Sequence, residues 1–400
     1  MDRPRLLNSF INLGHTADHL LMLIFPTVVL AMAPAFGWSY EDMLKLSLGG
    51  FVAFGAFSLP AGWLGDRWSR RGMMIVFFLG TGAAAILAGC AQTPWQLAVA
   101  LTLVGAFAAI YHPVGIAMLV KDEARVGRAL GINGIWGNLG VAFAALSAGA
   151  LAELAGWRAA FILPGLAVMA IGVAFAMVVP AVPAGSGGRT QRREVLDNAA
   201  LVRVFVVLLV ATICGGIIFN ATTIAMPKVF DEQLRALTQS TLGVGALVCM
   251  VYTIAAFSQY CVGRLIDKVP VRTVFVPVAL MQVPLLYLAA HLQNWAMLAV
   301  AVAMMFFIFG QIPINDAMVA RYTDEHWRAR VYAVRYVVSF GASTLAVPLI
   351  ARLHGESGNF ATVFVVLSGL AVVITLAALL VPQRRGAVAP VAPVAAAAAE

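Results

Sequence analysis

The chain reads Gly62-Trp-Leu-Gly-Asp66-Arg67-Trp-Ser-Arg70-Arg71 between two long apolar segments. The pattern Gly-x-x-x-Asp-Arg-x-x-x-Arg returns in weaker form as Gly263-x-x-x-Asp267-Lys268-x-x-x-Arg272, with every matched position 201 residues later. Pro26 and Pro227 are separated by the same 201 residues. A repeat at one offset in equivalent surroundings indicates two halves with the same order of elements.

The composition places both halves in a membrane. The 400 residues are 62% hydrophobic and 11% charged, and their mean hydropathy is +0.92. A soluble domain usually has about 25% charged residues, whereas a helix that crosses a bilayer needs about 20 apolar residues. Twelve such segments cover 6–33, 44–65, 73–91, 95–120, 128–151, 159–180, 199–227, 239–262, 272–291, 295–320, 330–351 and 361–382. We expect an all-α membrane protein with twelve transmembrane helices in two pseudo-symmetric six-helix bundles.

The basic residues predict an orientation for these helices. With a cytoplasmic N-terminus, nineteen Lys and Arg residues fall on the cytoplasmic side and five fall outside, while Arg203 and Arg335 fall within spans. An excess of Lys and Arg marks cytoplasmic loops. We therefore predict a multi-pass protein of the bacterial inner membrane with both termini in the cytoplasm. The net charge of +8 is then an orientation signal and does not indicate nucleic-acid binding.

The longest polar stretch separates the two predicted bundles. Its sequence from Pro183 to Glu194 is rich in Gly, Ser and charge, as in flexible linkers. We assign residues 1–182 to an N-terminal six-helix bundle, 183–198 to a cytoplasmic linker and 199–385 to a C-terminal six-helix bundle. The segment 386–400 is nearly all Ala, Val and Pro and is predicted to be a disordered cytoplasmic tail.

Several kinds of protein are disfavoured by the motifs that the chain lacks. The four cysteines lie in apolar stretches without Cys-x-x-Cys spacing, so we expect neither a disulfide framework nor a zinc site. A phosphate-binding Gly-x-x-x-x-Gly-Lys-Ser/Thr loop is missing, which argues against an ATPase. The first apolar segment is longer than a signal-peptide core and is expected to remain uncleaved. We expect no enzyme activity and no cofactor, and a monomer in the lipid bilayer.

The first span carries the densest set of ionisable side chains. His15, Asp18 and His19, at i, i+3 and i+4, share one helix face, and each ionisable group at a helix centre costs about 2.5–3.5 kcal/mol to insert. His112 precedes Pro113, which removes a backbone hydrogen bond and favours a kink. Three interpretations stay open. Asp18 carries a coupling proton that the three histidines relay, the histidines and Asp18 bind a divalent metal, or the group is an internal hydrogen-bonded pair that packs the first span.

Other polar residues within spans predict a substrate site. Asn12 continues the polar face of the first span by one turn. Arg335 lies at shallow depth, where it binds an anion, forms a gate ion pair with Asp316, or extends its side chain to the cytoplasmic face. The candidate substrate-binding residues are Asn12, Tyr111, His112, Asn133, Asn220, Gln311, Asn315, Asp316 and Arg335.

Four glycines occur at a spacing of three in the fifth span. They are Gly131, Gly134, Gly137 and Gly140. Small residues let helices approach closely, so we predict that this face packs at the seam between the halves, although ordinary helix packing explains the pattern nearly as well.

The twelve spans, the six-plus-six repeat and the stretch 62–71 closely resemble the major facilitator superfamily over essentially the whole folded chain. Gly105-Ala-Phe-Ala-Ala-Ile-Tyr111-His112-Pro113 and Gly14-His15-Thr-Ala-Asp18 look like the fosmidomycin-resistance branch of exporters. The resemblance implies that spans 1, 4, 7 and 10 line a central cavity. Charges in the repeated loops can latch one conformation. The candidate gating residues are Asp66, Arg67, Arg71, Asp267, Lys268 and Arg272.

These features predict a secondary active transporter with a small-molecule substrate. The leading hypothesis is proton-coupled export of a small polar or anionic organic compound, in which the two bundles rock around a central site. The alternatives are a proton-coupled uptake symporter for an organic acid or a metal chelate, and a divalent-metal transporter that uses the histidines of the first span. A protein that keeps this fold but acts as a sensor or assembly factor is a further alternative.

Overall fold

The computed structural model describes residues 3–120, 126–180, 198–323 and 325–382. The predicted tail 386–400 lies outside these ranges, as does the predicted linker 183–198 apart from Asn198. The first half of the described chain forms α1 (Arg3–Phe36), α2 (Tyr40–Lys45), α3 (Leu48–Arg67), α4 (Arg70–Cys90), α5 (Pro94–Ala108), the π-helical turn η1 (Tyr111–Gly115), α6 (Ile116–Val120), α7 (Val126–Ala155) and α8 (Ala159–Val178). The second half forms α9 (Asn198–Gln233), α10 (Thr241–Lys268), α11 (Val271–Ala289), α12 (Asn294–Tyr322), α13 (Glu325–Ser343), α14 (Ala346–Ser357) and α15 (Ala361–Ala378).

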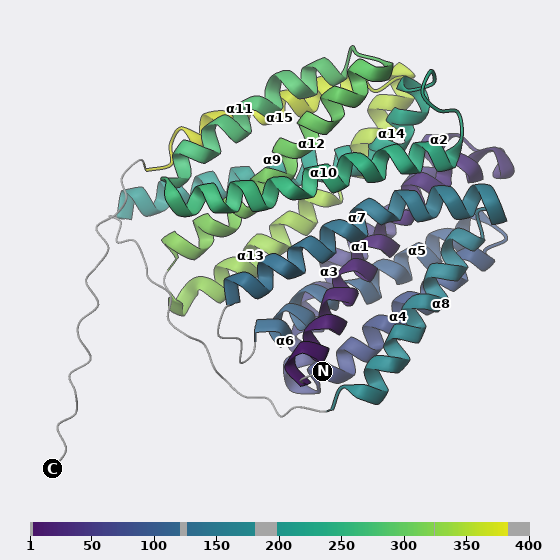
Figure 1. The fold of residues 1–400 in the computed structure, drawn as a ribbon, viewed down its shortest axis with the longest axis horizontal. Coiled ribbons are helices and arrows are strands. Elements are labelled where there is room, and N and C mark those ends of the chain that lie inside the picture. The colour runs from purple at the N-terminus through teal and green to yellow at the C-terminus, as the bar shows by residue number, and fades with distance from the viewer. Residues whose placement is uncertain (1–2, 121–125, 181–197, 324, 383–400) are drawn as a thin grey trace.

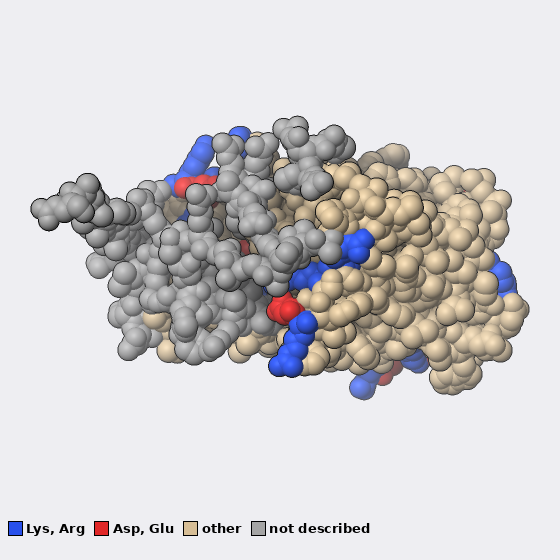
Figure 2. All heavy atoms as spheres, turned by 90° about the horizontal axis from the view of Figure 1, so that it is seen from below, with Lys and Arg blue, Asp and Glu red and all other residues tan. Residues whose placement is uncertain are grey.

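Twelve helical segments of the described residues are long and apolar enough to span a bilayer, which confirms the predicted number. Most of them begin and end within a few residues of the predicted bounds. The second span joins α2 to α3, and the fourth joins α5, η1 and α6. Figure 2 shows one face of the molecule, on which the few Lys, Arg, Asp and Glu side chains gather in small groups and leave a wide uncharged surface. Such a surface suits contact with lipid tails.

The eleventh span differs from its prediction. It covers Val337–Ser357 instead of 330–351 and consists of the end of α13, a turn, and α14. Arg352 and His354 follow the predicted end, but α14 continues until Gly358, whose φ of +69° ends the helix. Glycine adopts this left-handed conformation without the steric strain of a side chain.

The helices α1–α8 pack mainly with one another, as do α9–α15, and Figure 1 shows the two sets side by side. The seam between the sets is formed largely by α7 against α10. A Cβ atom on Gly149 would lie 2.4 Å from the backbone oxygen of Thr241, and one on Gly245 would lie 2.3 Å from that of Ala145. Only glycine therefore permits this backbone approach.

The four spaced glycines of α7 do not form this seam as a group. A Cβ atom on Gly137 would meet the ring of His15, and one on Gly140 would meet the backbone of Thr16, so both glycines pack against α1 within the first set. Only Gly134 has a neighbour in the second set, the side chain of Gln259 at 3.7 Å. The spacing predicted a close helix contact correctly, but for the most part with a different partner.

The two ends of the helix bundle differ in the segments that lie there, and we name them the near end and the far end. The near end is the one at which α1 begins and which carries the repeated charged stretches. The far end is the one at which α1 ends, where α2 packs against α14 (Figure 1). Four side chains cap helices at their first turn: Ser39 accepts from the Asp42 amide, Ser69 from the Gly72 amide, Thr93 from the Gln96 amide and Ser240 from the Gly243 amide. These caps satisfy amides that a helix start leaves unpaired.

Candidate functional site

The fourth span contains a π-helical turn at the residues that the sequence singled out. Pro113 has no amide hydrogen to give to the helix ladder, and the turn η1 covers Tyr111–Gly115. Close packing encloses it, since a Cβ atom on Gly62 would lie 3.1 Å from Pro113 and one on Gly65 would lie 2.9 Å from Val114. The glycines of the repeated stretch thus let α3 lie directly on η1. Single π turns within α-helices occur often at functional sites.

The turn η1 brings His112 to the polar face of α1. His15, Asp18 and His19 of α1 and His112 form one group, which we call the central cluster. The ring of His112 lies 5.3 Å from that of His15 and 5.7 Å from that of His19, centroid to centroid. Nε2 of His112 lies 3.5 Å from a carboxylate oxygen of Asp18. The structure therefore assembles the four residues that the sequence nominated for proton coupling.

The position of His15 is held from three sides. Its Nδ1 lies 2.8 Å from the backbone oxygen of Asn133, which can only accept, so Nδ1 donates. The ring stacks on that of Tyr111, with centroids 4.8 Å apart. In neutral His15 the Nε2 atom then carries a lone pair, and it faces Nε2 of His19 at 3.1 Å. A single proton can be shared between these two nitrogens.

Asp18 is the most unusual member of the central cluster. Its side chain is 0% exposed, and neither carboxylate oxygen has a hydrogen-bond donor among the described residues. Burial of a carboxylate without hydrogen bonds is costly unless a positive charge or a proton compensates. Among the described residues His112 forms the ion-pair contact with Asp18, and it is cationic only when it carries a proton.

The three histidines also have the arrangement of possible metal ligands. One nitrogen from each of His15, His19 and His112 lies within 4.8 Å of the other two. The hydrogen bond from His15 to the Asn133 carbonyl is the kind of outer contact that orients a metal-binding imidazole. The described residues thus offer one site at which protons or a divalent cation could bind.

Three of the predicted substrate-binding residues form a hydrogen-bond network of their own. The Asn133 amide donates to Oδ1 of Asn12 at 2.9 Å and to the Tyr111 hydroxyl at 2.8 Å. The Tyr111 hydroxyl donates to the backbone oxygen of Ile11 at 3.0 Å. All three side chains are buried. In this conformation the network joins α1 to η1 and α7. It also contacts the central cluster, because the backbone oxygen of Asn133 accepts the hydrogen bond from His15.

The second half supplies a separate set of polar groups. Gln311 of α12 accepts from Gln282 of α11 at 2.8 Å and is buried. The Asn220 amide donates within α9 to the Gly216 oxygen at 2.8 Å, whereas Oδ1 of Asn315 is buried without a donor among the described residues. Arg335 forms the predicted ion pair with Asp316, whose side chain is 47% exposed. The hydrogen bonds and the ion pair of this set lie within the second half.

Two phenylalanines meet where the central cluster contacts the second half. Phe340 of α13 packs against Phe54 of α3, with centroids 4.7 Å apart, and against His112 at 5.7 Å. A Cβ atom on Gly55 would lie 3.2 Å from Phe340. Phe340 was not nominated from the sequence, because an apolar residue in a span gives no signal of its own.

The candidate gating residues of the near end make contacts within their own halves. Asp66 pairs with Arg70 at 2.7 Å, and the Arg67 guanidinium lies over the Trp63 ring at 5.0 Å. Arg71 donates to the backbone oxygens of Ala176 and Val179 at the end of α8. A positive charge there complements the helix dipole.

The repeated stretch of the second half behaves in the same way. Asp267 lies 3.9 Å from Arg321, also of the second half. A latch between the halves at the near end therefore stays a prediction.

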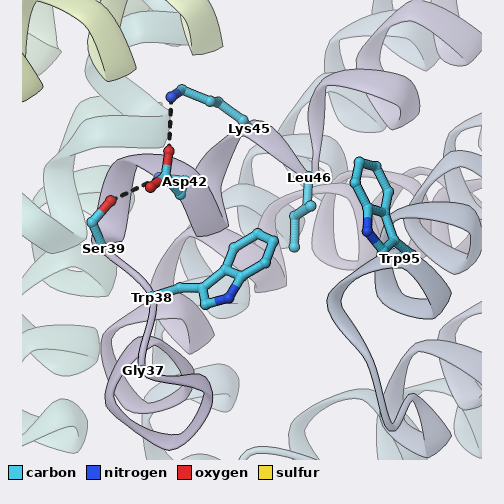
Figure 3. Close-up of a pocket in the computed structure, with 7 residues that line it drawn as sticks. All are labelled: Gly37, Trp38, Ser39, Asp42, Lys45, Leu46 and Trp95. Carbon is cyan, nitrogen blue, oxygen red and sulfur yellow. Dashed lines mark hydrogen bonds and ion pairs between the residues drawn. The ribbon is translucent and has the colours of Figure 1, made fainter.

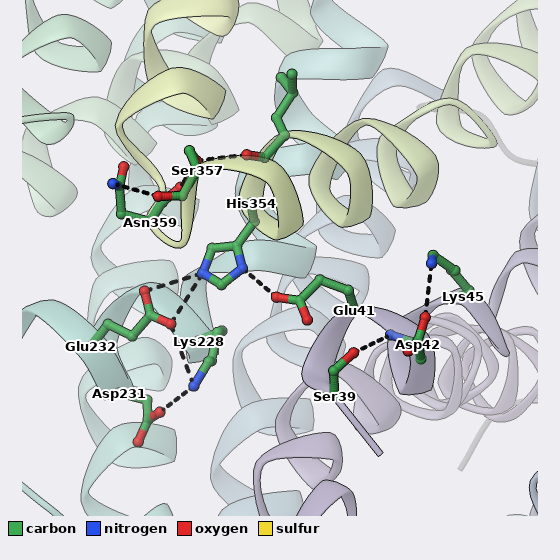
Figure 4. Close-up of polar contacts among 11 residues, drawn as sticks. Ser39, Glu41, Asp42, Lys45, Lys228, Asp231, Glu232, His354, Ser357 and Asn359 are labelled. Atoms are coloured by element: carbon green, nitrogen blue, oxygen red, sulfur yellow. Dashed lines mark hydrogen bonds and ion pairs between the residues drawn. The ribbon is translucent and has the colours of Figure 1, made fainter.

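An ion-pair cluster at the far end was missed by the sequence analysis. His354 of α14 contacts Glu41 of α2 and Glu232 of α9, so this cluster joins the two halves (Figure 4). The predicted eleventh span ends before His354, and Glu41 and Glu232 lie just outside the predicted spans 44–65 and 199–227. A search for ionisable residues just beyond predicted span ends would have found all three.

The far end also carries an open surface pocket of about 490 Å³, away from the central cluster. Trp38 and Trp95 form its apolar walls, and the ion pair of Asp42 with Lys45 lies at its edge (Figure 3). Tryptophans at the ends of membrane-spanning helices are typical of the bilayer–water interface. We assign the pocket no part in the central site.

Twelve apolar helices in two packed sets, with a buried cluster of ionisable residues in one set, define a multi-pass integral membrane protein of the transporter class. The chain belongs to the Major Facilitator Superfamily, whose family model matches residues 16–258 and 236–399. It is therefore a transporter and not an enzyme.

Two relatives of this chain come from Streptomyces species. The puromycin resistance protein pur8 of Streptomyces alboniger is 32% identical over 149 residues, which are 36% of this chain and 30% of that protein. A probable actinorhodin transporter of Streptomyces coelicolor is 28% identical over 209 residues, which are 49% of this chain and 35% of that protein. The matched stretches thus span about a third of each relative.

Solved structures show the same fold at low identity. A POT family transporter in complex with 5-aminolevulinic acid matches with a TM-score of 0.75 and 13% identity, over 94% of this chain and 96% of that chain. A D-xylose–proton symporter matches with a TM-score of 0.75 and 14% identity, over 95% and 98% of the two chains. These likenesses bear out the predicted fold.

Proposed function

We propose that the protein is a proton-coupled exporter of a small polar or anionic organic compound and that Asp18 carries the coupling proton. The observation that carries this proposal is the complete burial of the Asp18 carboxylate, without a hydrogen-bond donor among the described residues and 3.5 Å from His112. Two protonation states of the pair of Asp18 and His112 reduce the free-energy cost of that burial. A proton on Asp18 removes the charge, and a proton on His112 pairs with it.

The remaining histidines give the proton a path. His19 and His15 face each other through Nε2 at 3.1 Å, and His19 approaches His112 with ring centroids 5.7 Å apart. An imidazole ring can accept a proton on one nitrogen and release one from the other. A proton can therefore pass among the three rings and reach the Asp18 carboxylate by small changes of side-chain torsion.

The cargo is proposed to bind on the second-half side of Phe340. Asn220, Asn315 and the Asp316–Arg335 pair are the polar groups available there. An anionic cargo would compete with Asp316 for the Arg335 guanidinium. Displacement of Phe340 as the halves rock would then link that event to His112.

Export is favoured by the names of the relatives, one a puromycin resistance protein and the other a probable actinorhodin transporter. The likeness of the Tyr111-His112-Pro113 region to the fosmidomycin-resistance branch points the same way. We further propose that the chain is a monomer in the bacterial inner membrane, with two six-helix bundles and the near end and both termini in the cytoplasm. The excess of basic residues predicted on that side supports this orientation.

Proteoliposomes that hold a pH-sensitive dye test the proposal. Puromycin and the phosphonate fosmidomycin serve as probe cargoes, and antiport predicts that either one, added to one side, moves protons in the opposite direction. Asp18→Asn should abolish this proton movement, because the amide cannot be protonated. Asp42→Asn, at an exposed aspartate of the far end, is the matched control. Proton movement in the same direction as the cargo indicates uptake by symport, and unchanged coupling in Asp18→Asn refutes the assigned role.

A divalent metal ion is a second candidate cargo, favoured by the three converging histidines. Zinc accepts imidazole nitrogen and carboxylate oxygen as ligands. Zinc flux into metal-free proteoliposomes, lost in His19→Ala, would favour this candidate over the export of an organic compound. The exposed His291 of the far end provides the control variant His291→Ala.

A further inference from the structure

The ion-pair cluster at the far end contains a histidine between two carboxylates from different halves. Nδ1 of His354 lies 2.5 Å from Oε1 of Glu41 on α2. Nε2 of His354 lies 3.1 Å and 3.3 Å from the two carboxylate oxygens of Glu232 on α9. We call these three residues the far-end clasp (Figure 4). The His354 side chain is 6% exposed.

The clasp geometry requires a protonated histidine. A carboxylate can only accept hydrogen bonds, whereas neutral imidazole donates from one nitrogen and carries a lone pair on the other. With a carboxylate oxygen at each nitrogen, neutral His354 would turn its lone pair towards one of the two anions. Only the imidazolium donates to Glu41 and Glu232 at the same time, so one proton holds both hydrogen bonds between α14 and its two partners.

The other charged groups around the clasp leave it short of positive charge. On α9, Lys228 bonds to Asp231 at 2.8 Å and lies 3.4 Å from Glu232. Two carboxylates of α9 thus share one lysine, and Glu41 adds a third. Neutralisation of His354 would leave three negative charges against the single positive charge of Lys228.

The neighbouring helices add no further charge that could replace the proton. On α2, Asp42 and Lys45 pair with each other, and on α14, Arg352 and Glu356 do so. Tyr40 of α2 faces His354 with its ring, at a centroid distance of 5.8 Å. The helix α15 has no charged residue in Ala361–Ala378, and α13 offers among its described side chains only Arg335, which pairs with Asp316.

We propose that His354 is a second proton-binding site, separate from the central cluster, and that its proton holds the far ends of the two halves together. When the proton leaves, the contact between Glu41 and His354 weakens and the halves separate at this end. The inference rests on the alternating-access part of the proposed function and is independent of the cargo and of the role of Asp18. In the proposed orientation the far end faces outwards, so an acidic exterior closes the outer side.

The distance between the far ends can be measured as a function of pH. Trp95 of the first half and Trp295 of the second are strongly exposed and follow each other at an offset of 200. The four native cysteines of the full chain are replaced by alanine, and cysteines are introduced by Trp95→Cys and Trp295→Cys. Spin labels are attached to these two cysteines, and the protein is placed in lipid nanodiscs. Electron–electron double resonance then gives the ratio of short to long distances between about pH 5 and pH 8, the range in which histidine titrates.

The clasp predicts that the ratio of short to long distances falls on the order of 10- to 100-fold as the pH rises, which corresponds to the loss of one hydrogen bond between charged groups. His354→Gln and, as a second variant, Glu41→Gln should remove most of this pH dependence. His291→Gln should keep it, since His291 is an exposed far-end histidine outside the clasp. Asp18→Asn should also keep it, whatever its effect on flux.

Three results would overturn the proposal. In the first, the ratio of short to long distances does not change with pH in the protein with an intact clasp. In the second, the pH dependence of that ratio survives in both His354→Gln and Glu41→Gln. In the third, the pH dependence disappears in Asp18→Asn while it persists in His354→Gln. None of these measurements needs a transported cargo, so failure of the clasp and failure of proton-coupled export remain distinguishable.

Discussion

The substitution Gly137→Ala tests how tightly the central cluster is built. A Cβ atom at this position would lie 2.6 Å from both Cε1 and Nε2 of His15. The ring cannot retreat freely, because Nδ1 bonds to the Asn133 oxygen at 2.8 Å and the ring stacks on Tyr111. Overpacking of this kind costs about 1–3 kcal/mol, and the loss of the Asn133 bond would add about 1 kcal/mol.

The same helix offers a matched control. Gly131→Ala places its Cβ atom where nothing lies within 4 Å. Both substitutions gain about 1 kcal/mol of intrinsic helix propensity, so the comparison cancels that gain. We expect Gly131→Ala to be as stable as the parent or more stable, and Gly137→Ala to be less stable than Gly131→Ala by about 1–3 kcal/mol.

Thermal unfolding of the purified protein in detergent, followed by tryptophan fluorescence, provides the measurement. For a cooperative unit of the size of one half, that difference corresponds to a gap of about 2–10 °C between the two variants. Gly137→Ala with a midpoint equal to or above that of Gly131→Ala would refute the tight fit of His15 against α7. Equal losses in both variants would show that α7 rejects any added methyl group, and would contradict the reasoning as well.

Three further changes have defined outcomes. Tyr111→Phe removes the hydroxyl that joins Asn133 to the Ile11 oxygen and should lower stability by about 1–3 kcal/mol, measured as a lower thermal midpoint. Asp66→Asn should slow flux in proteoliposomes without loss of cargo-induced thermal stabilisation, and loss of that stabilisation at normal expression would contradict a latch role. Gly358→Ala forces a side chain into a backbone with φ of +69°. It should lower the midpoint by a few degrees, equivalent to about 1 kcal/mol, whereas Gly369→Ala, with nothing within 4 Å of the added methyl group, should not.

The sequence predicts the number of spans well because hydropathy is a property of each segment alone. It predicts the ends of the spans less well where a helix continues past polar or charged residues. The eleventh span shows this, since α14 carries Arg352 and His354 and still continues to Ser357. The helix ends where Gly358 adopts a left-handed conformation, and no hydropathy value reports a backbone angle.

The central cluster is predictable in part for a similar reason. Helix periodicity alone puts His15, Asp18 and His19 on one face. The approach of His112 depends on the packing of α3, α1 and η1, and the sequence indicates it only through Pro113 and the glycines that permit it. Phe340 could not be predicted from one sequence, because its contact with His112 exists only once the two halves meet.

Glycines illustrate the same limit from the opposite side. The regular spacing of Gly137 and Gly140 predicts a close helix contact but does not identify the partner helix. In the structure these two face α1, while Gly149 and Gly245, which belong to no repeated pattern, form the backbone contact between α7 and α10. A spacing rule gives the face of a helix, and only the packed structure gives its partner.

The central cluster and the far-end clasp share one element, the first helix and its continuation. Asp18 lies in the middle of α1, and the helix runs on to Phe36, about 27 Å further at 1.5 Å per residue. There the Trp38 amide bonds back to the Ala33 oxygen at 3.2 Å, which fixes the start of α2 and with it Glu41. Pro26 and Pro34 each remove a ladder bond between the two sites and provide points of bending in the helix. A tilt of α1 that is absorbed by bending at these prolines leaves Glu41 in place beside His354, so the pH dependence of the clasp is expected to persist in Asp18→Asn.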